Sequence, residues 1–173
     1  TDHINMVGQT QKSTHAMLQA KFFELAKMLN SIPVSSSSDA HICPGARFTD
    51  MPSYTNWAHE GLDYCIQNGI MSGTSATTFS PNAPVTRQDM ATILYNYAKN
   101  VLDLDVFDTA DLTGYPDYSS ISGYARTAMS WAVAQGLICG ADNGMGVVTL
   151  QPKGDATRAQ TAAVIMRFCQ NVL

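Results

Sequence analysis

Apolar residues recur along three stretches of the chain with the spacing of one helix face, at positions i, i+4, i+7 and i+11. The three stripes are Leu18, Phe22, Leu25 and Leu29; Met90, Leu94, Tyr97 and Val101; and Thr161, Ile165, Phe168 and Val172, of which Thr161 is the one polar member. Each helix has to bury its stripe, and packing the three helices against one another buries all of them. The pattern therefore predicts an all-α fold with a three-helix core of local pseudo-symmetry.

Two segments of the chain repeat one pattern of aromatic, acidic and glycine positions. FTDMPSYTNWAHEGLDYCIQNGIMSG begins at Phe48 and YPDYSSISGYARTAMSWAVAQGLICG begins at Tyr115, a constant offset of 67 positions. From Thr86 and Thr157 onward the offset is 71, so the second copy carries four extra residues, which fall in ADNGMGVVTL. Insertions are tolerated at such a Gly-rich loop tip. Repetition at this scale predicts two similar structural units.

Each copy is expected to form a short helix, a turn and a longer helix. The first helices are expected over about 54–67 and 121–134, with Asp50 and Asp117 as their caps and with glycines at 69 and 136 as their C-terminal breakers. The second helices are expected to begin at Thr86 and Thr157, since a side-chain acceptor three residues later is close to a capping box.

These limits divide the chain into five parts. We expect a partial repeat over 1–34, a Ser-rich linker over 35–47, a repeat over 48–102, an acidic connector over 103–114 and a repeat over 115–173. The partial repeat keeps only the second helix, because 13 residues precede its Thr14 cap whereas 36 separate Asp50 from Thr86.

Composition narrows the classes of partner. The 173 residues carry a formal charge of −4, and only 14% of them are charged, against roughly 25% in an average soluble domain. A mildly acidic chain without a basic block lacks the electrostatic footprint of a nucleic-acid-binding protein, and no apolar run reaches the roughly 18 residues of a membrane span.

The first ten residues, TDHINMVGQT, lack the features of a signal peptide and the chain lacks an initiator Met, so we expect a mature product or a cut fragment.

Residues that could carry metal or catalytic chemistry are scattered. Four cysteines, Cys43, Cys65, Cys139 and Cys169, include no CxxC pair, and they are compatible with two disulfides or with four reduced thiols. The four histidines show no HxxxH or HExxH spacing, so no metal site and no cofactor are expected. The aspartates of the connector lack the glycine and the terminal Glu of an EF-hand loop, which favours a solvated connector. No nucleophile motif is present, although a Cys–His pair is not excluded, and we expect no enzyme activity.

The ordered motifs of both copies resemble the S-layer homology family. The first copy contains Phe48-Thr49-Asp50-Met51, Trp57-Ala58, Gly69-Ile70-Met71-Ser72-Gly73, Phe79-Ser80-Pro81 and Thr86-Arg87-Gln88-Asp89, and the second copy departs mainly in having Leu150-Gln151-Pro152. The resemblance covers about 48–173 in full and about 12–30 in part. It implies three units in a pseudo-threefold spindle whose centre is formed by the Thr-Arg helices, with one prong missing here.

The resemblance also implies a function. Members of this family anchor secreted proteins non-covalently to the secondary cell-wall polysaccharide of Gram-positive-type envelopes, often through a pyruvylated amino sugar held in grooves between repeats. The expected location is therefore extracellular, in the cell wall or S-layer.

Eight residues are candidates for the ligand site. Arg87 and Arg158 place a guanidinium at a helix N-terminus, where free N–H groups and the positive end of the dipole favour an anion such as a carboxylate. The other candidates are Asp50 and Asp117 at the groove walls, Gly73 and Gly140 at turns that a sugar could approach closely, and Trp57 and Tyr124 as flat faces for a pyranose ring.

Alternatives stay open for each of these residues. The arginines could pair with acidic neighbours, the aspartates could act only as caps, the aromatic residues could pack between helices and the glycines could serve only the turns. His15 stands at the Arg position of the partial copy and is mostly neutral at pH 7, so the groove there should bind an acid poorly. Because one prong is missing, a second function is also considered, in which another chain supplies the prong and the protein is an assembly module.

Overall fold

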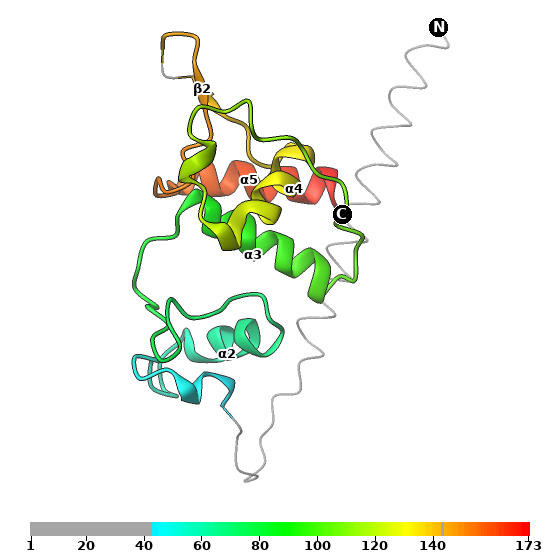
Figure 1. Ribbon diagram of the computed structural model, residues 1–173. Helices are drawn as coiled ribbons and strands as arrows, with labels where there is room; N and C mark the ends of the chain where they lie inside the picture. The colour runs from blue at the N-terminus through cyan, green and yellow to red at the C-terminus, as the bar shows by residue number, and fades with distance from the viewer. Residues whose placement is uncertain (1–42, 143) are drawn as a thin grey trace, which may run out of the picture. The chain divides into compact units, whose positions relative to one another are not determined.

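The computed structural model describes residues 43–142 and 144–173 (Figure 1). The predicted partial repeat, the His15 groove and most of the predicted linker lie outside the described residues. The described elements follow in chain order, with η for 3-10 helices: η1 (Pro44–Arg47), α2 (His59–Gln67), α3 (Arg87–Asn100), η2 (Tyr118–Ser120), η3 (Gly123–Ala125), α4 (Arg126–Ala134), β1 (Ala141–Asp142), β2 (Val148–Thr149) and α5 (Arg158–Asn171). The described part is therefore mostly helical.

The longer helix of each repeat begins as predicted. Thr86 caps α3 by accepting the backbone N–H of Asp89, and the Asp89 carboxylate accepts the N–H of Thr86 in return. Thr157 and Gln160 form the same reciprocal capping box at α5. Each box satisfies two of the N–H groups that the first turn of a helix leaves without a partner.

The shorter helices begin later than predicted. α2 starts at His59, after turns over 54–58, and α4 starts at Arg126, directly after η3. In the first repeat the Asn56 side chain accepts the N–H of Ala58 at 2.9 Å, and such local side-chain bonds compete with helix formation. Asp50 and Asp117 therefore lie well before these helices, and the prediction that they cap them is wrong.

The turns that follow the shorter helices contain glycine at the two positions that were predicted to end those helices. Gly69 and Gly136 have φ values of 63° and 66°, in the left-handed region that glycine adopts without a steric penalty. An amide from the end of the longer helix then secures each turn, because Asn100 donates to the carbonyl of Gly69 at 3.0 Å and Asn171 to that of Gln135 at 2.8 Å.

The core lies where α3, α4 and α5 meet. Trp131 of α4 is 1% exposed, and its ring packs edge-on against Tyr95 of α3 and Phe168 of α5. Small residues on α3, Ala91 and Ala98, are fully buried, which lets the helices approach closely. The predicted stripe of α5 is wrong at one position, since Ile165 is 50% exposed and its neighbour Val164 is buried instead.

Three further features of the structure extend or correct the predictions made from the sequence. The antiparallel pair β1–β2 forms in the insertion, with Ala141 opposite Thr149, so the fold is not purely helical. The connector over 103–114 exposes its aspartates, as expected, but it also buries Val106 and Leu112 in the core. All four cysteines are described and all are free thiols.

Candidate functional site

Asp50 and Asp117 each fasten the loop that precedes the longer helix of their own repeat. The Asp50 carboxylate accepts the backbone N–H groups of Phe79 at 2.8 Å and Ser80 at 2.7 Å. Asp117 accepts those of Leu150 at 3.1 Å and Gln151 at 2.7 Å. The bond from Phe79 is the main reason why the pKa of Asp50 lies below its ordinary value, because it stabilises the charged form. Both aspartates are therefore loop anchors.

Gly73 and Gly140 occupy positions where a side chain does not fit. A Cβ on Gly73 would come within 2.2 Å of the Phe48 ring and 2.6 Å of the Thr78 carbonyl, and a Cβ on Gly140 would come within 2.1 Å of Val148. The packing of the turn against these neighbours therefore requires glycine, whether or not a ligand also approaches there.

Arg87 joins the two repeats. It is 8% exposed, and it donates from Nε to the Leu150 carbonyl at 2.8 Å and from Nη2 to the Cys139 carbonyl at 3.0 Å. Burial lowers the pKa of its guanidinium, because a low-dielectric surrounding disfavours the charged form. The two carbonyl partners compensate for this cost, and the Asp117 carboxylate also favours the charged form. Arg87 therefore serves the contact between the repeats.

The N-terminus of α3 is closed by the same loop of the second repeat. The N–H of Arg87 bonds to the carbonyl of Gly154 and the N–H of Gln88 to that of Pro152, both at 2.9 Å. These two bonds occupy donors that an anion would otherwise use.

Arg158, the counterpart of Arg87 in the second repeat, lies in a different setting. It is exposed at the start of α5, and within residues 43–142 and 144–173 no carbonyl or carboxylate holds its guanidinium. Of the two arginines predicted to bind a carboxylate, Arg158 is thus the accessible one.

The two predicted aromatic faces are both accessible. Trp57 is 94% exposed, so the alternative that it packs between helices is wrong. Tyr124 is 63% exposed, and its hydroxyl donates to Asp89 Oδ1 at 2.6 Å and accepts from Gln88 Nε2 at 3.1 Å. Burial of the hydroxyl and its bond to Asp89 raise the pKa of Tyr124 to about 12. The Tyr124 ring is therefore held at a fixed position by α3.

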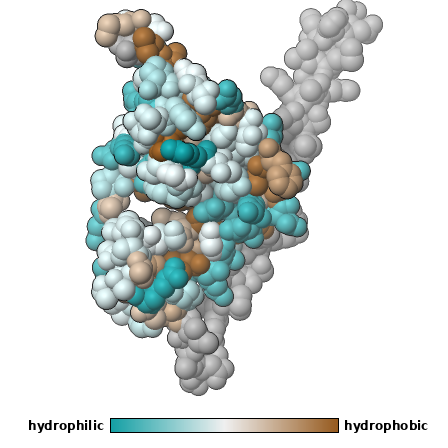
Figure 2. All heavy atoms as spheres, viewed as in Figure 1, coloured by the Kyte–Doolittle hydropathy of each residue, from teal (hydrophilic) through white to brown (hydrophobic). Residues whose placement is uncertain are grey.

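A groove of about 710 Å³ lies beside α3 and reaches Tyr124 of the second repeat. Figure 2 shows a hollow between the part of the chain that carries α2 and the part that carries α3. Of the eight candidate residues, Gly73 and Tyr124 line this groove, while Asp50 fastens the loop that forms its wall. Trp57, Arg87 and the three candidates Asp117, Gly140 and Arg158 of the second repeat are not part of its lining.

The groove lining is mostly apolar and neutral. Hydroxyl and amide groups come from Ser72, Thr74, Thr92 and Asn96, and Asp89 is the one charged residue among the described lining residues. Both Asp89 oxygens already accept hydrogen bonds from protein groups. A surface of hydroxyls, an amide and an exposed tyrosine ring suits the uncharged face of a sugar.

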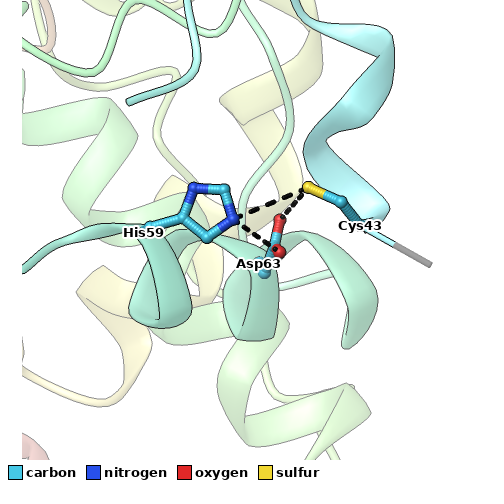
Figure 3. Close-up of side chains that lie close together, drawn as sticks. All are labelled: Cys43, His59 and Asp63. Atoms are coloured by element: carbon cyan, nitrogen blue, oxygen red, sulfur yellow. Dashed lines mark hydrogen bonds and ion pairs between the residues drawn. The ribbon is translucent and has the colours of Figure 1, made fainter. Parts of the chain in front are cut away.

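A second cluster of polar side chains escaped the sequence analysis. Cys43, His59 and Asp63 converge next to η1, with His59 and Asp63 buried and Cys43 partly buried (Figure 3). The spacing between His59 and Asp63 is one helical turn, which was the available signal, but nothing in the sequence indicated that Cys43 would fold back onto that helix.

The cluster does not have the properties of an activated nucleophile. Burial is the main factor that raises the pKa of the Cys43 thiol, and the Asp63 carboxylate raises it further. A catalytic thiolate instead needs its pKa lowered by a nearby positive charge or a helix N-terminus.

Comparison with known proteins identifies the family to which the chain belongs. The family model of the S-layer homology domain matches residues 47–91 and 114–162, so one match falls in each of the two repeated segments. The chain belongs to this family, as its motifs predicted. It is a non-catalytic cell-wall anchoring module located at the cell surface.

The relatives include two surface-layer proteins and an endoglucanase. The chain is 33% identical over 119 residues, 67% of its length, to the surface-layer 125 kDa protein of Lysinibacillus sphaericus, of which it covers 9%. It is 34% identical over 113 residues, 64% of its length, to an endoglucanase of Bacillus sp. (strain KSM-635), of which it covers 11%. An S-layer protein of Bacillus thuringiensis subsp. finitimus is 25% identical over 123 residues, 70% of the chain and 13% of the relative. The chain thus spans about a tenth of the length of these proteins.

Two further findings complete the comparison. No solved structure matches the chain. Within the part of the chain that the structure describes, no helix is both long and apolar enough to cross a membrane.

Proposed function

We propose that this chain anchors its parent protein by binding an acidic, pyruvylated secondary cell-wall polysaccharide. The groove beside α3 takes the uncharged part of the glycan against Tyr124 and the hydroxyl groups of the lining. Arg158 takes the carboxylate of the pyruvyl group. The observation that carries this assignment is the exposed guanidinium of Arg158 at the start of α5.

The two arginines have different roles because their guanidinium N–H groups differ in accessibility. An arginine fork can bind a carboxylate through two parallel hydrogen bonds, but only when its N–H groups are accessible. Arg87 already bonds two backbone carbonyls, so it contributes by holding the repeats together. Asp50 and Asp117 contribute in the same indirect way, by fastening the loops that border the binding surface.

Binding of the purified chain to isolated cell walls tests this proposal. Arg158→Ala should weaken binding about tenfold or more, the equivalent of losing one charge-assisted hydrogen bond or more. Lys153→Ala is the matched control, because it removes an exposed cation of the same repeat, and it should change binding less than about twofold, as expected where no hydrogen bond is lost. A folded Arg158→Ala variant that binds as tightly as the unmodified chain would contradict the assignment.

A second function, assembly with another polypeptide, is favoured by one observation. The start of α3 is closed by the carbonyls of Pro152 and Gly154, whereas the start of α5 has no such carbonyl within the described residues. A loop of the same kind from another chain would complete the second junction. Light scattering tests this function, since assembly predicts a mass that rises with protein concentration, and a constant monomer mass without a co-purifying partner counts against it.

A further inference from the structure

The geometry of Cys43, His59 and Asp63 points to a zinc-binding site, and we propose that this cluster binds one Zn²⁺. The three side chains offer a sulfur, an imidazole nitrogen and a carboxylate oxygen, which is a ligand set that zinc accepts. None of these three residues lines the groove assigned to the glycan, and the proposal does not depend on that function.

Two of the three distances between the side chains are close to those around a tetrahedral zinc ion, and in the third pair the Cys43 thiol donates a hydrogen bond to Asp63 Oδ1 at 3.2 Å. Cys43 Sγ lies 3.7 Å from His59 Nε2, and His59 Nε2 lies 3.3 Å from Asp63 Oδ2. Zinc bonds of about 2.0–2.3 Å at tetrahedral angles place neighbouring ligand atoms about 3.3–3.6 Å apart. An ion can therefore enter between the three groups with small side-chain movements, as their convergence in Figure 3 suggests.

The surroundings orient two of the three ligands. His59 Nδ1 lies 2.8 Å from the carbonyl of Pro52, and because a carbonyl only accepts, the ring proton sits on Nδ1. This bond favours the tautomer with its proton on Nδ1, and that is the form whose Nε2, which faces Cys43 and Asp63, can bind zinc. The backbone N–H of Gly45 donates to Asp63 Oδ1 at 3.0 Å, which steadies the carboxylate while Oδ2 faces His59.

The second repeat provides an internal comparison. The bond from the Phe48 N–H to the Gly45 carbonyl recurs as the bond from Tyr115 to Leu112, so the offset of 67 extends to this region. At that offset Cys43, His59 and Asp63 correspond to Ala110, Arg126 and Ser130. There Ser130 and Ala110 join the segment to α4 by hydrogen bonds in both directions. The second repeat thus closes this junction with a serine and backbone groups, whereas the first repeat closes it with hydrogen bonds from Cys43 and Gly45 to Asp63, whose carboxylate can also bind a metal.

Zinc would join the start of the first repeat to α2. The ion would be held by three protein groups, with a water molecule completing the tetrahedron. Binding requires the Cys43 thiolate, so the thiol proton leaves to solvent when the metal enters. The expected role is structural, because the site ties the start of η1 to α2 through Cys43 and His59, which are 16 positions apart in the chain.

Metal titration of the complete, reduced and chelator-treated chain tests the proposal. We expect one equivalent of Zn²⁺ to bind, and one equivalent of Co²⁺ to give the near-ultraviolet thiolate-to-cobalt absorption together with the visible bands of a tetrahedral site. Outer-sphere changes alone weaken metal binding about 10–100-fold, so Cys43→Ser, His59→Gln and Asp63→Asn should each weaken it at least about 100-fold.

Cys139→Ser is the matched control, since it removes an exposed thiol elsewhere in the chain, and it should leave the cobalt spectrum unchanged. Circular dichroism identifies any variant that fails to fold, and the conservative Cys43→Ser change then decides alone. Three results would overturn the proposal: no thiolate–cobalt band in the unmodified chain, a band that survives in Cys43→Ser, or full affinity in folded His59→Gln and Asp63→Asn variants.

Discussion

Arg87 and Arg158 occupy the same position in two copies of one repeat, yet their surroundings differ completely. Arg87 is buried and bonds two carbonyls of the second repeat, whereas Arg158 is exposed and has no such partner in the described part of the chain. The helix starts differ in the same way, since among the described residues backbone carbonyls close the start of α3 but not that of α5. One motif can therefore serve the fold in one copy and remain available for a ligand in the other.

The largest effect on stability is expected from replacing Arg87. Arg87→Ala leaves the buried carbonyl of Leu150 and the partly buried carbonyl of Cys139 without their donor, so we expect the free energy of unfolding to fall by about 2–4 kcal/mol. Arg158→Ala removes an exposed side chain, and its effect should stay within about 0.5 kcal/mol. Urea unfolding of both variants measures the difference. Equal losses would mean that the two arginines do not have different roles.

A second comparison concerns the glycines of the two turns. Gly73→Ala places a methyl group against the Phe48 ring and the Thr78 carbonyl, and we expect a loss of about 1–3 kcal/mol from overpacking. Gly140→Ala meets mainly the side chain of Val148, which is 43% exposed, whereas the nearest backbone atom, the Thr149 carbonyl oxygen, is 3.2 Å from the added Cβ. The loss at Gly140 should therefore be smaller. Thermal unfolding compares the two, and a larger loss at Gly140 would contradict this ranking.

The smallest effect concerns Tyr124, which ties the two repeats through Asp89. Its pKa is raised to about 12 from an ordinary value of 10.0, so the folded state holds the phenol proton more tightly than the unfolded state. The stability that this provides is complete below pH 10.0 and is lost as the pH rises through about 12.

Tyr124→Phe removes this contribution and is its natural test. The difference in unfolding free energy between the unmodified chain and Tyr124→Phe should shrink over that alkaline interval, and ultraviolet titration should show one fewer late-titrating tyrosine. A difference that does not change with pH would show that Tyr124 is not held by Asp89.

The sequence predicted the features that depend on local chemistry. The capping boxes at Thr86 and Thr157 and the left-handed turns at Gly69 and Gly136 follow from neighbouring residues alone, and all four were predicted. Contacts between distant segments were harder to predict. The pairing of Asp50 with the amides of Phe79 and Ser80 spans about 30 positions, and a carboxylate before a helix resembles a cap until the loop is seen.

Contacts between distant segments also limited the prediction of the candidate site. The Thr-Arg motif identified both arginines, but nothing in the motif distinguishes a guanidinium that bonds a neighbouring repeat from one that faces solvent. That difference depends on whether another loop packs against the start of the helix. The cluster of Cys43, His59 and Asp63 was missed for the same reason, because its members meet only when η1 packs on α2.

Binding of the purified chain to cell-wall polysaccharide, native against chemically depyruvylated, tests the central claim most directly. The account predicts that the chain sediments with the native polymer and that depyruvylation abolishes most of this binding, because the carboxylate that Arg158 recognises is gone. Equal binding to both polymers, or binding to neither, would contradict the claim that an acidic glycan is the ligand.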